Sequence, residues 1–184
     1  MSATNRGSKR IESDFYATPI PVVKKLIDRH IFRYGNILEP CAGNGNIINA
    51  LREYWAWNFT TSIEIREAER KNLEEHSEQV FICDFLKWKP KLEYSTIITN
   101  PPYSIAQEII EHCFEIASPE TEIIMLLRLA FLESKKRYDF WQKHPVNELY
   151  VLSERPSFTG KGTDATAYAW FVWNNSNEQK VIVI

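Results

Sequence analysis

Four consecutive residues, Asn100-Pro101-Pro102-Tyr103, carry the groups needed to activate an aromatic amino group. Such an amino group is a poor nucleophile because its lone pair is delocalised into the ring. The Asn100 side-chain oxygen and the Pro101 carbonyl could bind its hydrogens out of the ring plane and free that lone pair. The prolines restrict the backbone, so both acceptors are preorganised. Tyr103 has an aromatic face on which a base can stack.

Asparagine cannot act as a general base at neutral pH. We therefore expect the proton to leave after the new bond has formed, once the nitrogen is cationic. The remaining catalytic contribution is the in-line orientation of the nucleophile and the leaving group. From average composition, this tetrapeptide occurs by chance about once in a few thousand chains of this length. The competing interpretation is a rigid proline turn that follows a strand.

The segments around this tetrapeptide alternate between strands and helices. Seven strands are predicted: a segment that ends at Glu39 and residues 61–65, 80–83, 95–99, 122–127, 149–152 and 165–173. Four helices are predicted: residues 22–31, a helix from about residue 47, and residues 66–76 and 105–116. The alternation predicts an α/β fold with a mostly parallel seven-stranded sheet and helices on both faces. The last two strands have no helix between them, which predicts an antiparallel edge pair at the C-terminus.

The ends of the preceding strands carry residues suited to a ligand, and ligands of open α/β sheets bind beyond the carboxyl ends of the strands. After the first strand, Gly43 and Gly45 allow a tight turn next to a helix N-terminus. Ile48 stands where a dinucleotide-binding fingerprint has its third glycine. Glu39, four residues before Gly43, suits a ligand with an ammonium group better than one with a pyrophosphate. Alternatively, the glycines only form a turn.

Two further acids follow strands. Glu64 ends the second strand, and its carboxylate could accept hydrogen bonds from both hydroxyls of a ribose. The alternative for Glu64 is a solvated acid at a strand end. Asp84 and Phe85 follow the third strand, where an acceptor and an apolar ring could recognise and cover an adenine. Asp84 could instead cap the next helical turn.

Together these residues resemble the N6-adenine DNA methyltransferases of the Rossmann-like class, in which a glycine loop, two strand-end acids and Asn/Asp-Pro-Pro-Tyr/Phe/Trp follow in this order. The resemblance covers roughly residues 14–173 and implies a methyltransferase fold, S-adenosylmethionine as cofactor and adenine in DNA as substrate. Upstream, residues 14–19 resemble the family's segment that closes over the methionine end of the cofactor. The implied cofactor residues are Phe15, Tyr16, Thr18, Pro19, Glu39, Pro40, Gly43, Gly45, Glu64, Ile65, Asp84, Phe85 and Asn100.

Downstream, residues 126–133 and 155–160 resemble small phage- and prophage-type members, in which an aromatic near the position of Phe158 flanks a flipped base. Restriction-type relatives carry a separate target-recognition domain, for which this chain has no additional segment. We therefore expect one catalytic domain over residues 14–184, preceded by a mobile arm over residues 1–13. Sequence selectivity would then be low, or it would come from loops, dimerisation or a partner.

The charge is unevenly distributed, although the net charge is only -2. Residues 1–35 carry seven Lys or Arg against three Asp or Glu, residues 36–127 carry seven against fifteen, and residues 128–161 carry seven against four. Two basic zones that flank an acidic body are compatible with a polyanionic partner, although they could also be ordinary solvated surfaces. The basic residues expected to contact nucleic acid are Arg128, Lys135, Lys136 and Arg155.

The composition is that of an ordinary globular domain, with 184 residues, 44% hydrophobic and 25% charged. No apolar run is long enough to span a bilayer, and the polar N-terminus lacks the apolar stretch of a signal peptide. The three cysteines show neither a disulfide framework nor a metal-binding pattern, and no two histidines have metal-ligand spacing. We expect no metal site and a cytoplasmic location.

The tetrapeptide leaves three alternatives open. Enzymes of the same fold that methylate glutamine side-chain amides in proteins also use Asn-Pro-Pro-Tyr, because an amide nitrogen poses the same electronic problem. An RNA adenine methyltransferase would use the same residues. Residues 15–19 and the basic stretch 128–161 favour nucleic acid over protein. A non-catalytic subunit that only binds the cofactor is the third alternative, against which the intact glycine loop and tetrapeptide argue.

Two segments near the C-terminus invite other interpretations. The aromatic residues of 165–173 could stack on bases, but their position in a predicted strand favours packing in the core. The apolar residues 181–184 could add a short strand or mediate association, and the sequence does not distinguish these roles.

Overall fold

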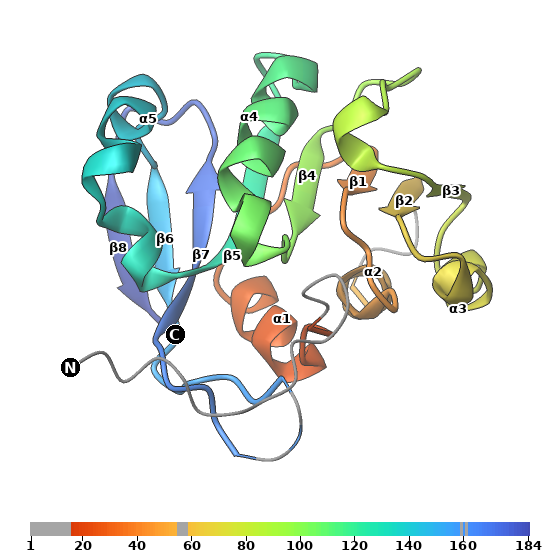
Figure 1. Cartoon of the computed structure of the whole chain (residues 1–184), viewed down its shortest axis with the longest axis horizontal. Helices are drawn as coiled ribbons and strands as arrows, with labels where there is room; N and C mark the ends of the chain where they lie inside the picture. Colours follow the sequence, from red (N-terminus) through yellow and green to blue (C-terminus); the bar gives the residue numbers. More distant parts are fainter. Residues whose placement is uncertain (1–15, 55–58, 159, 161) are drawn as a thin grey trace.

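The computed structural model describes residues 16–54, 59–158, 160 and 162–184, which form a single sheet flanked by helices (Figure 1). Its strands are β1 (Ile37–Glu39), β2 (Thr60–Glu64), β3 (Gln79–Ile82), β4 (Thr96–Thr99), β5 (Glu122–Arg128), β6 (Glu148–Val151), β7 (Tyr168–Trp173) and β8 (Lys180–Val183). Their order is β3-β2-β1-β4-β5-β7-β6-β8, and only the pairs that involve β7 are antiparallel. The predicted arm over residues 1–13 lies outside the described residues.

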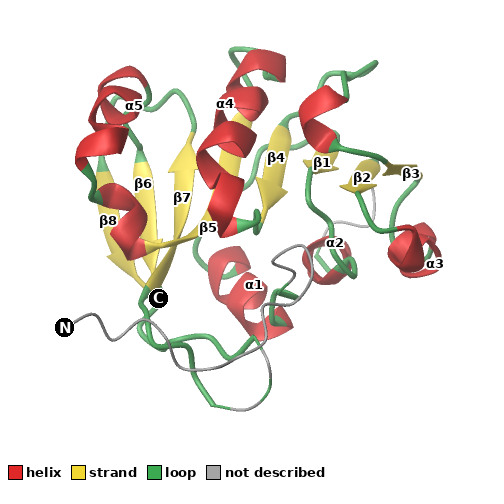
Figure 2. Cartoon of the chain, in the orientation of Figure 1, coloured by secondary structure: helices red, strands yellow, loops and turns green. Residues whose placement is uncertain are grey.

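Helices cover both faces of the sheet, as the alternating pattern predicted (Figure 2). They are α1 (Ile20–Ile27), α2 (Asn46–Arg52), α3 (Arg70–Glu74), α4 (Ala106–Ile116) and α5 (Tyr138–Lys143). α1 and α2 pack on one face, and α4 and α5 pack on the other. None of the helices within the described ranges is both long and apolar enough to cross a membrane.

The sheet has eight strands, so the predicted count of seven was wrong. The additional strand is β8, which pairs in parallel with β6 and forms the edge beyond the predicted antiparallel pair of β6 and β7. The Lys180 amide donates to Asn147 O at one end of this pairing, and the Ile184 amide donates to Val151 O at the other. Ile182 and Ile184 pack against the core that contains α1. The C-terminal apolar residues therefore form a strand, one of the two roles left open by the sequence.

Two helices differ in extent from the prediction. α1 begins after Pro19, but it ends at Ile27 instead of residue 31. Ile31 is 92% exposed, so no burial favours continuing the helix to that residue. The helix predicted over residues 66–76 is a 3-10 turn followed by α3, in which Leu73 is the buried residue. One buried apolar side chain stabilises a long helix poorly, because most helix stability in proteins comes from packing.

The aromatic strand β7 lies in the core, as predicted. It runs between β5 and β6, and all six of its residues are buried. The indole N–H of Trp170 donates to Val22 O at 3.2 Å, and that of Trp173 donates to His144 O at 3.1 Å. These hydrogen bonds satisfy the only polar group of each buried indole. The two tryptophans therefore tie β7 to α1 on one face and to the end of α5 on the other.

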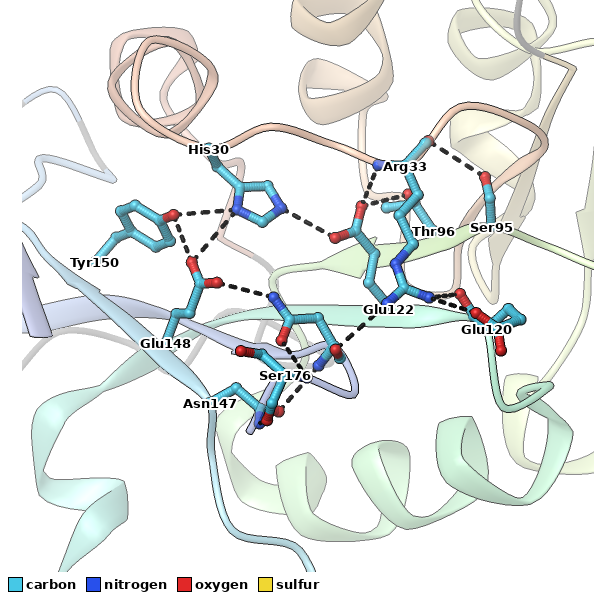
Figure 3. Close-up of polar contacts among 11 residues, drawn as sticks. His30, Arg33, Ser95, Thr96, Glu120, Glu122, Asn147, Glu148, Tyr150 and Ser176 are labelled. Carbon is cyan, nitrogen blue, oxygen red and sulfur yellow. Dashed lines mark hydrogen bonds and ion pairs between the residues drawn. The ribbon is translucent and has the colours of Figure 1, made fainter. Parts of the chain in front are cut away.

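A buried polar network joins the amino ends of β4, β5 and β6 to the loop after α1 (Figure 3). The Glu122 carboxylate accepts hydrogen bonds from the Arg33 amide at 2.9 Å and the Thr96 hydroxyl at 2.7 Å, and it contacts His30 Nε2 at 3.0 Å. The other nitrogen of the His30 ring lies 3.1 Å from the Tyr150 hydroxyl. Because Glu122 is 1% exposed, each of these contacts replaces water that the carboxylate has lost. The network holds the sheet at the end opposite to the strand carboxyl ends.

Candidate active site

A cleft lies beyond the carboxyl ends of β1, β2, β3 and β4, where the sequence predicted a ligand. Its empty volume, including the part open to solvent, is about 750 Å³, within the range of small-molecule sites. Most of the predicted cofactor residues line it, namely Tyr16, Thr18, Glu39, Pro40, Gly43, Glu64, Ile65, Asp84, Phe85 and Asn100. Pro19 and Gly45 are not among the lining residues, and Phe15 lies outside the described part of the chain.

The glycine loop turns sharply between β1 and α2. Gly43 and Gly45 have positive φ angles of 57° and 81°, which disfavour residues with a Cβ atom. A Cβ atom on Gly45 would also lie 3.2 Å from the Leu73 side chain of α3. Gly43 borders the cleft, whereas Gly45 ends the turn as the residue that precedes α2. The predicted ligand role therefore suits Gly43, and Gly45 is needed for the turn and for packing against α3.

Glu39 is a buried carboxylate at the floor of the cleft. It is 1% exposed, and its Oε2 atom has no hydrogen-bond partner within the described residues. Burial raises the pKa of Glu39 well above its ordinary value, and the charge of Glu64 adds to this effect, while the Ile48 amide opposes it. A buried, unpartnered acceptor of this kind is costly unless a ligand supplies a donor or a positive charge. The position of Glu39 therefore fits a ligand with an ammonium group.

Glu64 ties the end of β2 to the glycine loop. Its Oε2 accepts a hydrogen bond from the Gly43 amide at 2.8 Å, and its Oε1 accepts from the amide and the Nε of Arg66 at 3.0 and 2.9 Å. An ionised carboxylate has about four acceptor positions. In this conformation Glu64 therefore keeps room for one ribose hydroxyl, and accepting both hydroxyls requires Arg66 to release one of its hydrogen bonds.

Asp84 has the capping role that the sequence left open, and its position leaves the proposed adenine contact possible. Its Oδ1 accepts a hydrogen bond from the Leu86 amide at 3.1 Å, so Asp84 caps the 3-10 turn Phe85–Lys87. It also borders the cleft, together with the buried ring of Phe85. Ile65, which is 62% exposed, borders the same cleft. An adenine could therefore lie among two apolar side chains with the Asp84 carboxylate at its edge.

Residues 16–18 line the cleft, and two side-chain amides hold them there. Asn46, at the start of α2, donates to Thr18 O at 2.8 Å. Asn100 donates through Nδ2 to Tyr16 O at 3.2 Å. Tyr16 and Thr18 are 84 and 28 residues away from these partners along the chain. The predicted closing segment and the predicted catalytic asparagine are thus in direct contact.

The tetrapeptide borders the cleft at the end of β4 through two of its four residues. Asn100 and Pro102 border the cleft, while Pro101 is buried beside them. The Tyr103 hydroxyl donates to Asn100 Oδ1 at 2.8 Å. Burial raises the pKa of Tyr103 well above its ordinary value, so the hydroxyl keeps this proton at neutral pH. The acceptor atom predicted to bind a substrate amino group is therefore engaged by a neighbouring side chain.

An arginine and several aromatic side chains form a cluster around Tyr103. The Arg128 guanidinium lies over the Tyr103 ring, 5.0 Å from its centroid, and the Tyr168 ring lies 5.7 Å away. Phe158 packs between Tyr168 and Tyr16, at centroid distances of 5.2 and 5.9 Å. Tyr103, Arg128 and Phe158, all predicted to contact substrate, are therefore brought into one cluster. In this conformation Arg128 covers one face of the ring that was expected to stack on a base.

The remaining basic residues predicted to contact nucleic acid are not part of this cluster. Lys135, Lys136 and Arg155 are exposed and do not border the cleft. Ser134, which precedes the two lysines, has a φ of 139°, a conformation that residues other than glycine rarely adopt. The Arg137 side chain donates to the carbonyls of Ala130, Phe131 and Glu133, and so fixes the loop that carries these lysines.

Sequence reasoning missed several residues of the site. Asn46 and Arg66 each follow a predicted ligand residue by a few positions, which is the one signal that could have pointed to them. Tyr168 and Asp164 carried no such signal, because they reach the site only through the pairing of β7 with β5. The other lining residues that the sequence did not single out are Ala17, Cys41, Ala42, Asn44, Ile47, Cys83, Ile105 and Ile109.

Two of the lining residues are cysteines, but the surroundings of Cys41 do not favour reactivity. All three cysteines are free thiols, and burial raises the pKa of Cys41, with the nearby carboxylates Glu64 and Glu39 adding to the effect. A thiol that stays protonated is a weak nucleophile and a weak metal ligand. Within the described ranges, no group of three or more His, Cys, Asp or Glu is arranged to hold a metal ion.

No family model matches the chain. Among solved structures, it is similar to a putative RNA methyltransferase from Pyrococcus horikoshii, with a TM-score of 0.65, 14% identity and 94% of each chain covered. The 23S rRNA methyltransferase ErmE matches with a TM-score of 0.63 and 20% identity, over 90% of this chain and 71% of that one.

A putative class I S-adenosylmethionine-dependent methyltransferase from Listeria monocytogenes matches with a TM-score of 0.63 and 12% identity. That match covers 90% of this chain but 62% of the Listeria protein, so the chain spans less than two thirds of that protein's length. At these identities the similarity establishes the fold alone. The chain has the Rossmann-like α/β fold of the class I S-adenosylmethionine-dependent methyltransferases.

Proposed function

We propose that this protein transfers a methyl group from S-adenosylmethionine to the N6 amino group of adenine in DNA. The observation that carries the proposal is the position of Asn100-Pro101-Pro102-Tyr103 at the end of β4, in the wall of the cleft formed by the ends of β1, β2 and β3. The residues proposed to bind the cofactor thus line one cavity together with Asn100. Methyl transfer needs this arrangement, because the donor and the acceptor must be held in line.

The cleft residues fit S-adenosylmethionine. Glu39 would hold the ammonium group of the cofactor, which supplies the missing partner of its buried carboxylate. Glu64 would accept a hydrogen bond from the ribose, and Asp84 would accept one from the adenine. Ile65 and Phe85 would cover the faces of that adenine. When bound, the cofactor supplies an electrophilic methyl group on a sulfonium.

Asn100 and Pro101 would act on the substrate. Their oxygen atoms accept the two hydrogens of the substrate amino group, which frees the nitrogen lone pair from the ring. One of the two acceptor positions of Asn100 Oδ1 is already taken by the Tyr103 hydroxyl, 2.8 Å away, and we expect this hydroxyl to move aside for the substrate. The Tyr103 ring then becomes available as a stacking platform for the base. Asn100 keeps its orientation during this change, because its Nδ2 remains hydrogen-bonded to Tyr16 O.

The Asn100 amide takes no proton, because it is not basic at neutral pH. The amino group loses a proton only after methylation, when the nitrogen is cationic and acidic. In the cluster around Tyr103, the phenol cannot receive it at neutral pH, since burial raises the pKa of Tyr103 and it is already protonated. We therefore assign the proton to solvent at the open side of the cleft.

RNA is the second candidate substrate. The neighbour ErmE is named a 23S rRNA methyltransferase, and a neighbour from Plasmodium falciparum is named a dimethyladenosine transferase. With 20% and 14% identity, they support the fold and leave the nucleic acid open. The tetrapeptide would treat adenine in the same way in RNA and in DNA, so the distinction needs an experiment.

The test is a methyl-transfer assay with labelled S-adenosylmethionine on duplex DNA, single-stranded DNA, RNA and a protein extract, each in a separate reaction. We expect label in DNA for the wild-type protein and none for Asn100→Ala. Asn72→Ala, on the exposed side of α3, is the matched control and should label DNA like the wild type. Label confined to RNA or to protein would replace DNA by that substrate. Absence of label from every substrate would contradict the proposed activity.

A further inference from the structure

Arg128 occupies the position in which a substrate base would stack. It is the last residue of β5, and its guanidinium lies over the Tyr103 ring at 5.0 Å from the centroid. A guanidinium is planar and stacks on aromatic faces much as a base does. Stacked layers lie about 3.5 Å apart, so a base inserted between Arg128 and Tyr103 would need roughly 7 Å. The observed distance leaves no room for a base while Arg128 is in place.

A chain of hydrogen bonds holds Arg128 over the ring. The Arg128 Nε donates to the Tyr168 hydroxyl at 3.1 Å, and that hydroxyl donates to Asp164 Oδ2 at 2.9 Å. Asp164 is itself fixed, because its Oδ1 accepts from the Thr166 amide at 3.1 Å and its own amide donates to Pro156 O at 2.9 Å. Tyr168 is fully buried and faces Arg128 across the register of β5 and β7. Arg128 itself is exposed at the end of β5, but its guanidinium is oriented by these protein contacts.

The same cluster reaches the catalytic acceptor. Tyr103 lies under Arg128 and donates its hydroxyl proton to Asn100 Oδ1. While Arg128 stays over the ring, it restricts movement of Tyr103, whose hydroxyl takes one of the two acceptor positions of Asn100 Oδ1. Moving Arg128 would therefore uncover the stacking face and allow Tyr103 to release Asn100. One residue controls access to both parts of the base site.

We propose that Arg128 is the residue that selects a nucleotide over other amino-group substrates, an inference that rests on the proposed function. In the free protein Arg128 covers Tyr103, and on substrate binding its guanidinium transfers to the phosphate of the target nucleotide. Guanidinium and phosphate form strong bidentate hydrogen bonds, which replace the single bond to Tyr168 and the contact with Tyr103. A glutamine side chain brings no phosphate and leaves Arg128 in place.

The test compares deoxyadenosine with deoxyadenosine 5′-monophosphate, which differ only by the phosphate. Both are titrated calorimetrically into protein saturated with S-adenosylhomocysteine, so that neither can bind in the cofactor cleft. We expect the wild-type protein to prefer the monophosphate. Arg128→Gln has no guanidinium to lie over Tyr103 or to bind a phosphate. Deoxyadenosine should therefore bind to it at least about threefold more tightly than to the wild type, and the preference for the monophosphate should disappear.

Two further variants separate the two effects of Arg128, which are covering the Tyr103 ring and binding the phosphate. Arg128→Lys keeps the charge but loses the planar group, so it should bind deoxyadenosine more tightly and still prefer the monophosphate. Tyr168→Phe removes the hydroxyl that holds Arg128 over Tyr103, so both ligands should bind more tightly than they bind to the wild type. Lys71→Gln, an exposed charge on α3, is the control and should bind like the wild type.

Affinity for S-adenosylhomocysteine reports whether each variant is folded, and a variant that loses it is replaced by Arg128→Met. The proposal is overturned if Arg128→Gln, or Arg128→Met in its place, does not bind deoxyadenosine more tightly than the wild type does. It is also overturned if that variant still prefers the monophosphate. Methylation of DNA by the wild-type protein is measured separately. If DNA is methylated and these variants behave like the wild type, the role of Arg128 is wrong and the proposed function stands. If no nucleic acid is methylated, the proposed function itself fails.

Discussion

The Tyr103 hydroxyl donates a hydrogen bond to the Asn100 side-chain oxygen across 2.8 Å. Because the two residues are three positions apart in one tetrapeptide, the contact is local and needs no rearrangement of the fold. It places the proposed stacking residue on the proposed catalytic acceptor. The free protein therefore already uses one acceptor position of this oxygen, and we expect a substrate amino group to compete with Tyr103 for it.

Removing the Tyr103 hydroxyl should make the substrate site easier to occupy. Tyr103→Phe keeps the ring and leaves Asn100 Oδ1 without its internal donor. A hydrogen bond between neutral groups contributes about 1 kcal/mol, so kcat/KM for nucleic acid should rise about fivefold, mainly through a lower KM. Tyr103→Ala, which also loses the ring, should lower kcat/KM instead. If Tyr103→Phe is as impaired as Tyr103→Ala, the hydroxyl takes part in the reaction and the competition argument is wrong.

Glu39 should lower the stability of the cofactor-free protein as the pH rises. Burial raises the pKa of Glu39 above its ordinary value of 4.5, so the folded protein favours the protonated form. Below pH 4.5 the carboxyl is neutral in the folded and unfolded states, and its contribution is fully retained. Above 4.5 the unfolded chain loses the proton first, so the free energy of unfolding falls until the raised pKa is passed, by at most about 1.4 kcal/mol per pH unit.

Glu39→Gln has no such titration, so urea unfolding of the two proteins between pH 5 and 8 checks the effect. The stability of the variant relative to the wild type should increase with pH. The same variant should bind S-adenosylmethionine poorly, because a neutral amide gives the ammonium group no counter-charge. Parallel stability curves for the two proteins would show that Glu39 is ionised at no cost and would remove the argument for a missing cation.

The contact between Asn46 and Thr18 should matter for the cofactor more than for the fold. Asn46→Ala removes the hydrogen bond to Thr18 O, which helps to hold residues 16–18 at the cleft. Loss of about 1 kcal/mol should weaken S-adenosylmethionine binding roughly fivefold. Asn49→Ala, on the same helix and away from the cleft lining, is the control, and calorimetry on both variants is the measurement. Equal affinities in the two variants would mean that the segment closes without this hydrogen bond.

Glu122 should be essential for stability although it is remote from the cleft. Glu122→Ala leaves the Arg33 amide, the Thr96 hydroxyl and His30 without their shared acceptor. Breaking such a buried network costs about 3–5 kcal/mol, which urea unfolding would detect as a large fall in the midpoint. Glu120→Ala, whose side chain is 89% exposed, should change the stability by less than about 0.5 kcal/mol. Similar midpoints for the two variants would contradict a structural role for the network.

The cleft at the strand ends was predictable because its key residues end or follow their strands directly. Glu39, Glu64 and Asn100 each end or follow a parallel strand, and the sheet topology brings such positions together whatever the loops do. The predicted segments correspond to β1, β2 and β4, in which every residue is buried. The sequence pattern therefore sufficed for this part of the molecule.

The substrate side was predictable only in part. Arg128 and Tyr168 face each other because β7 inserts in antiparallel register beside β5, a pairing between segments 40 residues apart. The network of His30 and Glu122 joins residues separated by 92 positions and has no local signature. β8 was left open because four apolar residues suit either an edge strand or an interface. Long-range register decides each of these features, and periodicity within a segment does not report it.

The most direct test of the central claim is the identity of the methylated product. DNA incubated with the wild-type protein and S-adenosylmethionine would be digested to nucleosides and analysed by mass spectrometry, with Asn100→Ala in parallel. The account predicts N6-methyldeoxyadenosine from the wild type and none from the variant. A methyl group found on another base, or on glutamine of an added protein extract with none in nucleic acid, would contradict it.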